Sequence, residues 1–142
     1  MKRVMGIIVV LLIAFIGYRW YFYNLGIEIV SADIRTPAVN KAYMDLVFRN
    51  RDTNRTIEEI RFAVDLYDGE RCVDSDYYRY DGKLMPEEKS SMKNYWETWL
   101  NGCRSDDITK MKIAIRSVTY IDGSKRKADD DRLLWKTYYV NR

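Results

Sequence analysis

The stretch from Thr56 to Gly69 decides the fold class of this chain. It reads Thr56-Ile57-Glu58-Glu59-Ile60-Arg61-Phe62-Ala63-Val64-Asp65-Leu66-Tyr67-Asp68-Gly69. Its apolar residues fall on every second position from Ile60 to Leu66. This is the period of a half-buried β-strand rather than of a helix. Asp68-Gly69 predicts a turn at its end. One face of the strand must therefore pack against a second apolar surface.

Further strand patterns occur along the chain, separated by turn signals and polar loops such as 50–55. They lie at residues 27–35, 42–49, 72–80, 91–100, 111–120 and 134–140. The apolar positions change parity between Ile115 and Val118, which predicts a β-bulge at Arg116-Ser117. Asp122-Gly123 predicts a hairpin with 134–140 as its returning strand. About seven short strands predict an all-β protein with an immunoglobulin-like β-sandwich.

The alternation also predicts which side chains are buried. The expected core residues are Leu46, Phe48, Ile60, Phe62, Val64, Leu66, Trp96, Ile113 and Ile115, and the expected exposed ones are Arg61, Asp65, Lys93 and Lys112. In the segment 72–80 the tyrosines fit a short edge strand. Asp74, Asp76 and Asp81 would blunt that edge against pairing with other chains.

The N-terminal segment is apolar and uncharged from Val4 to Tyr18. At about 1.5 Å per residue this run spans roughly 22 Å, and residues 20–23 can extend it toward the ~30 Å of a bilayer core while Arg19 snorkels. We expect residues 1–23 to form a signal anchor, that is, one transmembrane helix, and residues 24–142 to form an extracytoplasmic sandwich.

The aromatic residues after the apolar run offer no small-residue cleavage site. An uncleaved anchor is therefore favoured over a cleaved signal peptide, and a buried helix of a soluble protein is a third alternative. Lys2, Arg3 and the free amine outnumber Arg19, so the N-terminus is expected in the cytoplasm. The predicted location is the inner membrane, single-pass, with the domain in the periplasm or outside the cell.

Charge and composition exclude several function classes. The net charge is +3, and three of the 24 basic residues precede Glu28, the first acidic residue, which leaves 21 basic against 21 acidic residues. A formally neutral domain argues against a nucleic-acid partner. The absence of histidine removes Ser-His-Asp triads and every histidine-containing metal site. We therefore expect no enzyme activity and no cofactor.

Two kinds of carboxylate cluster are candidates for chemical sites. Residues 129–131 are three aspartates, and with Asp106-Asp107 they could form a calcium site. The spacing fits no calcium loop, so a solvated charge cluster is the favoured interpretation, and no metal site is expected. Glu58-Glu59 and Glu87-Glu88 could suggest glycoside chemistry, but adjacent residues on a strand face opposite ways.

Cys72 and Cys103 are the two cysteines of the chain. If the domain lies outside the cytoplasm, both thiols meet an oxidising environment, which predicts a disulfide between them. Both come after strand signals, so turns at one end of the sandwich could bring them together. The alternative is a pair of free, buried thiols in a cytoplasmic protein.

The segment 91–100 is rich in aromatic side chains. Tyr95 and Trp99 fall on the face opposite to Trp96 if this segment is a strand. We expect Trp96 in the core and Tyr95 and Trp99 on the surface, where they are candidates for a recognition surface.

Several short motifs resemble a known family. They are Phe48-Arg49-Asn50, Thr56-Ile57, Val64-Asp65-Leu66-Tyr67-Asp68, Trp96 and the run from Val118 to Ser124. Together they resemble the small immunoglobulin-like domains of FxLYD type in bacterial envelope proteins, over residues 42–124. Val64 stands where the phenylalanine of the family name would be. The resemblance implies a secreted or membrane-anchored protein and supplies no catalytic residues.

The sequence therefore predicts a non-enzymatic, membrane-anchored domain that mediates protein–protein interaction or envelope assembly. Its expected partners are the lipid bilayer, through the N-terminal helix, and another envelope protein. The alternative is a module that binds a small ligand or glycan with its surface aromatics. A concave aromatic pocket would favour the ligand, whereas a flat aromatic patch or an unpaired edge would favour a protein.

Overall fold

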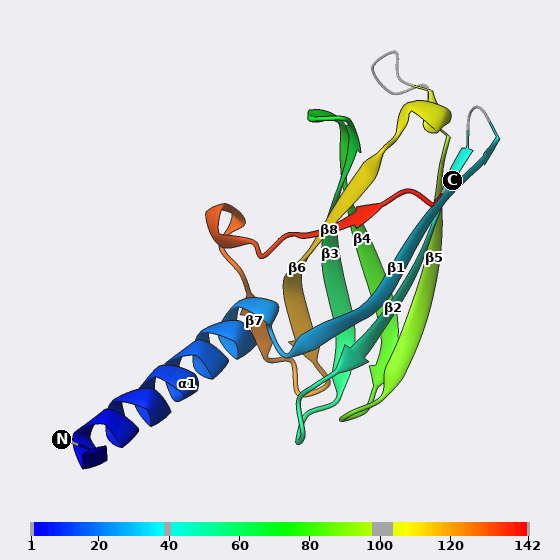
Figure 1. The fold of residues 1–142 in the computed structure, drawn as a ribbon. Helices are drawn as coiled ribbons and strands as arrows, with labels where there is room; N and C mark the ends of the chain where they lie inside the picture. Colours follow the sequence, from blue (N-terminus) through cyan, green and yellow to red (C-terminus); the bar gives the residue numbers. More distant parts are fainter. Residues whose placement is uncertain (1, 39–40, 98–103, 142) are drawn as a thin grey trace.

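The computed structural model describes residues 2–38, 41–97 and 104–141, and these are mostly β-structure (Figure 1). A helix, α1 (Lys2–Asn24), precedes the strands. The strands are β1 (Ile27–Ala38), β2 (Lys41–Asn50), β3 (Ile57–Asp68), β4 (Arg71–Leu84), β5 (Lys89–Glu97), β6 (Lys110–Tyr120), β7 (Lys125–Lys127) and β8 (Lys136–Tyr139). The described residues between strands also include the 3-10 helices η2 (Ser105–Asp107) and η3 (Asp130–Arg132).

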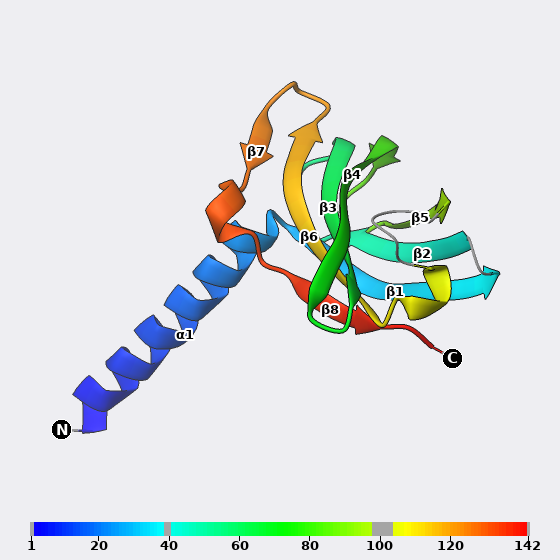
Figure 2. The ribbon, with the colours of Figure 1, turned by 90° about the horizontal axis from the view of Figure 1, so that it is seen from above.

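The strands form two sheets in which every pair is antiparallel. One sheet has the order β1-β2-β5, and the other has the order β4-β3-β6-β7, with β8 also paired to β6. The sheets face each other across the core, as Figure 2 shows from above. This arrangement confirms the predicted all-β class and is consistent with a β-sandwich.

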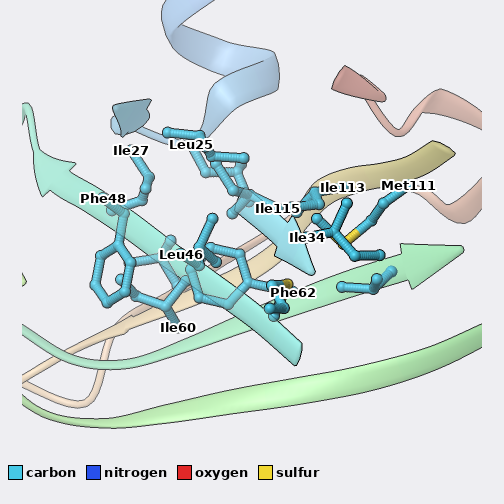
Figure 3. Close-up of a cluster of buried hydrophobic side chains, with 14 of the residues drawn as sticks. Leu25, Ile27, Ile34, Leu46, Phe48, Ile60, Phe62, Met111, Ile113 and Ile115 are labelled. Carbon is cyan, nitrogen blue, oxygen red and sulfur yellow. The ribbon is translucent and has the colours of Figure 1, made fainter. Parts of the chain in front are cut away.

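The core lies between the two sheets and is built by the alternation seen in the sequence (Figure 3). Along β2 every even-numbered side chain is buried. All predicted core residues whose side chains are described are buried: Leu46, Phe48, Ile60, Phe62, Val64, Leu66, Ile113 and Ile115. The side chain of Trp96 lies outside the described ones. Arg61 and Lys93 are exposed as predicted, whereas Asp65 and Lys112 are half-buried.

The predicted bulge in β6 is confirmed, because the register with β3 shifts between the partners Arg61↔Ser117 and Phe62↔Ile115. The predicted hairpin after β6 is present, but its returning strand is different. β7 pairs with the end of β6, and β8 pairs with the start of β6 instead. The returning chain is thus divided in two by η3, which a local turn signal does not reveal.

The loop after β2 is more buried than its polar composition predicts. Asn50 is fully buried, and its Nδ2 donates to the carbonyl oxygens of Arg55 and Leu84 at 2.8 and 3.1 Å. The backbone N–H of Asp52 donates to Asn50 Oδ1 at 2.9 Å, and the carboxylate of Asp52 accepts from Arg55 Nε at 2.9 Å. These bonds satisfy the buried polar groups and fix the loop.

Helix α1 confirms the predicted N-terminal helix and corrects its assignment. It projects away from the sheets in both views (Figures 1 and 2), and its apolar side chains from Met5 to Tyr18 are exposed. No helix within the described residues is long and apolar enough to cross a membrane. The uncharged run between Arg3 and Arg19 spans roughly 22 Å, less than the ~30 Å of a bilayer core. The predicted transmembrane anchor and the single-pass inner-membrane location are therefore wrong.

Candidate interaction surface

The outer face of the β1-β2-β5 sheet carries two rows of side chains that cross all three strands. One row places Arg35, Tyr43 and Tyr95 opposite one another in the pairing register. The Tyr43 and Tyr95 ring centroids lie 6.2 Å apart with the ring planes tilted by 34°. Tyr95 is 62% exposed and Tyr43 is 38% exposed. The two rings form a tyrosine pair on the solvent side of the sheet.

The neighbouring row is charged and places Asp33, Asp45 and Lys93 opposite one another. Two carboxylates facing each other on adjacent strands repel. Arg35 lies between them and reduces the repulsion, because its Nε lies 3.2 Å from the Asp33 carboxylate and its second terminal nitrogen pairs with Asp45. Lys93 Nζ lies 3.8 Å from Asp45, and its side chain is 82% exposed.

We call these two rows the tyrosine–charge ladder: Asp33, Arg35, Tyr43, Asp45, Lys93 and Tyr95. A shallow surface depression is lined by four of its members, Arg35, Tyr43, Asp45 and Lys93. The ladder combines exposed aromatic rings with ionic groups of both signs. Tyrosine and arginine are enriched at protein–protein interfaces, whereas aspartate and lysine are depleted there.

The ladder reaches the end of its sheet at β5, whose outer edge has no strand partner among the described residues. β4 ends the other sheet in the same way. On β4, however, two aspartates satisfy backbone donors: the N–H of Ser75 donates to Asp74 Oδ1 at 2.9 Å and that of Tyr77 to Asp76 Oδ1 at 2.7 Å. β4 lies at the edge of its sheet as predicted, but with 14 residues it is not the short strand expected. That the aspartates blunt this edge against other chains stays a prediction.

Burial raises the pKa of the Asp74 carboxyl above its ordinary value, and the nearby charges of Asp76 and Asp65 raise it further. The hydrogen bond from Ser75 opposes this rise because it stabilises the carboxylate. The cap at this edge thus combines a favourable hydrogen bond with an unfavourable charge.

Of the two residues predicted for the recognition surface, the structure describes one. Tyr95 is exposed on β5 as predicted, and Trp99 lies outside the described residues. Sequence reasoning missed its partner Tyr43, because the pairing of β2 with β5 joins segments that are far apart in the chain. The facing pair of Asp45 and Lys93, next to the tyrosines on the same face, was missed for the same reason.

The predicted disulfide is not tested by the structure. Cys72 is exposed at the start of β4 as a free thiol whose Sγ lies 3.4 Å from the carbonyl oxygen of Asp74. Cys103 lies outside the described residues. The bridge therefore stays a prediction.

The aspartates considered for calcium lie on separate elements. Asp107 on η2 accepts from the backbone N–H of Arg104 at 3.0 Å, and Asp130 on η3 pairs with Arg116 at 3.2 Å. Figures 1 and 2 both place η2 and η3 at different ends of the molecule. Within the described residues no three metal-ligating side chains form a group.

Comparisons with known proteins add little. No protein-family model and no curated protein matches the sequence. A crystal structure of a protein from Archaeoglobus fulgidus is 11% identical with a TM-score of 0.46, over 82% of this chain and 98% of that chain. A structural genomics target is 8% identical with a TM-score of 0.47, over 84% of this chain and 89% of that chain. A β-glucosidase from Bifidobacterium adolescentis is 9% identical with a TM-score of 0.45, over 87% of this chain and 20% of that chain. Similarities this weak carry no argument about this chain.

Proposed function

We propose that this protein is a non-enzymatic binding module whose immunoglobulin-like sandwich contacts another protein through the tyrosine–charge ladder. The observation that carries the proposal is the exposed pair of Tyr43 and Tyr95 beside the outer edge of β5, which has no strand partner among the described residues. An aromatic patch next to a free strand edge offers a partner both apolar contact and backbone hydrogen bonds. The FxLYD resemblance supports a domain of this kind without any catalytic set.

The local electrostatics also favour a protein partner. The carboxylates of Asp33 and Asp45 are already paired with Arg35, so a partner that covers them buries no isolated negative charge. Uncompensated burial of a charge is costly. The long side chains of Arg35 and Lys93 can cover a partner's surface while their charged ends stay in water.

A photo-crosslinking amino acid at position 95 tests this proposal. The matched control is position 77 on the other sheet, because Tyr77 and Tyr95 are 60% and 62% exposed. In the native host, we expect position 95 to form a discrete covalent adduct with a protein and position 77 to form none. Equal labelling from both positions, or no protein adduct from position 95, would contradict the proposal.

A small-ligand or glycan binder is the second candidate, and the depression beside Tyr43 favours it. In that case, titration with simple sugars shifts the ring signals of Tyr43 and Tyr95 in NMR spectra and Tyr43→Ala abolishes the shifts. An adduct from position 95 that contains a protein selects the first candidate.

A further inference from the structure

The outer edge of β5, to which no described strand pairs, defines what kind of partner segment the ladder can accept. We propose that this edge binds an extended acidic segment of the partner protein, which adds to the β1-β2-β5 sheet as a fourth strand. This inference rests on the proposed protein-binding function and specifies how that binding occurs.

The pairing of β5 with β2 determines which backbone groups are free. Asn50 N donates to the carbonyl oxygen of Glu88 at 3.0 Å, so the pair 50/88 is hydrogen-bonded. In an antiparallel ladder such pairs recur at every second residue. Even-numbered residues of β5 therefore bond to β2, and the N–H and C=O groups of residues 89, 91, 93 and 95 point to the open edge. No hydrogen bond from a described residue caps them, in contrast to Ser75 and Tyr77 on β4.

The edges at β1 and β6 are partly covered. β1 lies beside β8, and Asn141 Nδ2 donates to Asp33 Oδ1 at 3.2 Å across that side. The outer side of β6 carries β7 and β8. Among the described residues, nothing covers β5 on its outer side or caps its open-edge N–H groups, whereas two N–H groups of β4 are capped. An added strand gains a full row of backbone bonds at β5.

Charge selects the chemistry of the added strand. The β5 residues whose backbone groups point to the open edge include Lys89, Ser91, Lys93 and Tyr95. Their side chains lie on the outer face of the sheet, and all four are exposed. Opposite charges on facing residues of neighbouring strands are favourable. A complementary strand therefore places acidic residues opposite Lys89 and Lys93, four positions apart, with a small polar residue opposite Ser91.

A second copy of β5 fits this edge less well. In two-fold antiparallel pairing centred on Ser91 or Lys93, a lysine faces a lysine of the other copy. When the pairing is centred on Met92, Lys89 faces Tyr95 of the other copy and Lys93 faces Ser91 of the other copy. When the pairing is centred on Lys93, Lys89 faces Glu97 of the other copy, but no register of this kind gives both lysines a carboxylate, whereas an acidic segment supplies one to each.

The test uses the full chain, in mild nonionic detergent because helix α1 is apolar, and two labelled peptides. The acidic peptide is acetyl-Thr-Val-Glu-Thr-Thr-Val-Glu-amide, and its control has lysine in place of both glutamates. We expect the acidic peptide to bind at least about tenfold more tightly in fluorescence polarisation, since two facing charge pairs change from attraction to repulsion. We expect added salt to reduce this preference.

Charge-reversed variants provide the second arm. Lys89→Glu with Lys93→Glu is expected to invert the preference between the two peptides. Lys125→Glu with Lys127→Glu on β7 changes the net charge equally and is expected to leave the preference unchanged. Amide hydrogen exchange locates the bound strand: the acidic peptide should slow residues 89, 91, 93 and 95 and leave the even-numbered amides of β5 unaltered.

Ser91→Pro removes one outward N–H without removing a bond to β2 and is expected to abolish peptide binding. If this variant does not fold, the exchange pattern of the unmodified chain still decides. Equal binding of both peptides, or protection of β4 instead of β5, overturns the proposal. Slow exchange of the odd-numbered amides in a dimer without peptide assigns the edge to a second copy and also overturns it.

The crosslink from position 95 separates this inference from the function on which it rests. A protein adduct that persists in the Lys89→Glu, Lys93→Glu variant leaves protein binding intact and overturns the acidic strand. Loss of the adduct in that variant, with retention in the β7 control variant, supports both. Absence of any protein adduct in the unmodified chain overturns the proposed function itself.

Discussion

β4 and β5 each end a sheet, yet their outer edges differ in chemistry. On β4 the carboxylates of Asp74 and Asp76 bind the N–H groups of the residues directly after them, and Arg79 pairs with Asp81 at 2.7 Å. On β5 the outward row carries lysine, serine and tyrosine and, among described residues, no such cap. Two N–H groups on the β4 edge are thus satisfied within the chain, whereas among the described residues no side chain satisfies the donors on the β5 edge.

A substitution in the shared core has the largest expected effect, because both edges depend on it. Phe62 is fully buried on β3, and its ring lies 5.3 Å from that of Phe48 across the sandwich. We expect Phe62→Ala to lower the free energy of unfolding by about 3 to 5 kcal/mol. Urea denaturation monitored by tryptophan fluorescence measures the change. The exposed Tyr77→Ala is the control and should stay within about 0.5 kcal/mol.

The predicted disulfide would tie the β4 side to the segment after β5. If Cys72 and Cys103 are bonded, the closed loop of about thirty residues should contribute roughly 3.5 kcal/mol in the chain-entropy model. Reduction, or Cys72→Ser in the oxidised protein, should then lower the unfolding free energy by a similar amount. Thiol labelling of the unreduced, denatured chain gives the direct answer, because modification of both cysteines excludes the bond.

Asn50 anchors the connection between the two edges and gives an intermediate effect. Its side chain bonds to the carbonyl oxygen of Leu84 at the end of β4, and its backbone bonds to Glu87 and Glu88 just before β5. Asn50→Ala leaves buried carbonyl groups without a donor, at a cost of about 1 to 3 kcal/mol. Thermal unfolding beside the exposed Asn54→Ala isolates the effect. Equal melting temperatures for both variants would show that the buried amide is unimportant.

Local periodicity in the sequence was enough to predict individual strands, but not the order in which they pair. The alternation from Ile60 to Leu66 was enough to assign β3 and its buried face, because one side of a sandwich strand must be apolar. The parity change at Arg116-Ser117 was enough to locate the bulge. The pairing of Tyr43 with Tyr95 and the free edge of β5 depend on which strands become neighbours, and no local signal encodes that order.

The N-terminal segment shows a different limit. Its apolar composition predicted a helix that stands clear of the sandwich, and the structure agrees. The same composition also predicted that this helix spans a bilayer, and that prediction was wrong, because no helix within the described residues is long and apolar enough to cross a membrane. Asn50 and Asp52 give the opposite case. Their polar loop was expected to be exposed, but both residues are buried because their side chains have hydrogen-bond partners within the protein.

The smallest expected effect on stability concerns Asp74 on β4. Its variants distinguish the contribution of the hydrogen bond to Ser75 from that of the negative charge. Burial raises the pKa of Asp74, so the folded state holds the proton more tightly than the unfolded chain does. Ionisation of Asp74 therefore costs folded-state stability, and this cost appears as the pH rises through the folded pKa. Asp74→Asn keeps an oxygen for the N–H of Ser75 and removes the charge. We expect it to be more stable than the unmodified chain at pH 7, by less than about 0.5 kcal/mol because the group is largely solvated.

The advantage of Asp74→Asn should disappear as the pH falls below the ordinary range of an aspartate, because both states are then neutral at this position. Asp74→Ala removes the acceptor as well and should speed amide exchange at Ser75, whereas Asp74→Asn should leave that exchange slow. The alanine variant thereby leaves the N–H of Ser75 on β4 without its side-chain acceptor, like the N–H groups proposed to be free on β5. The acidic peptide should still bind to β5 in preference to β4, because the two lysines lie on β5. If Asp74→Ala and Asp74→Asn exchange equally fast at Ser75, the aspartate acts on this edge through its charge alone, and the contrast between the two edges is one of charge rather than of satisfied backbone donors.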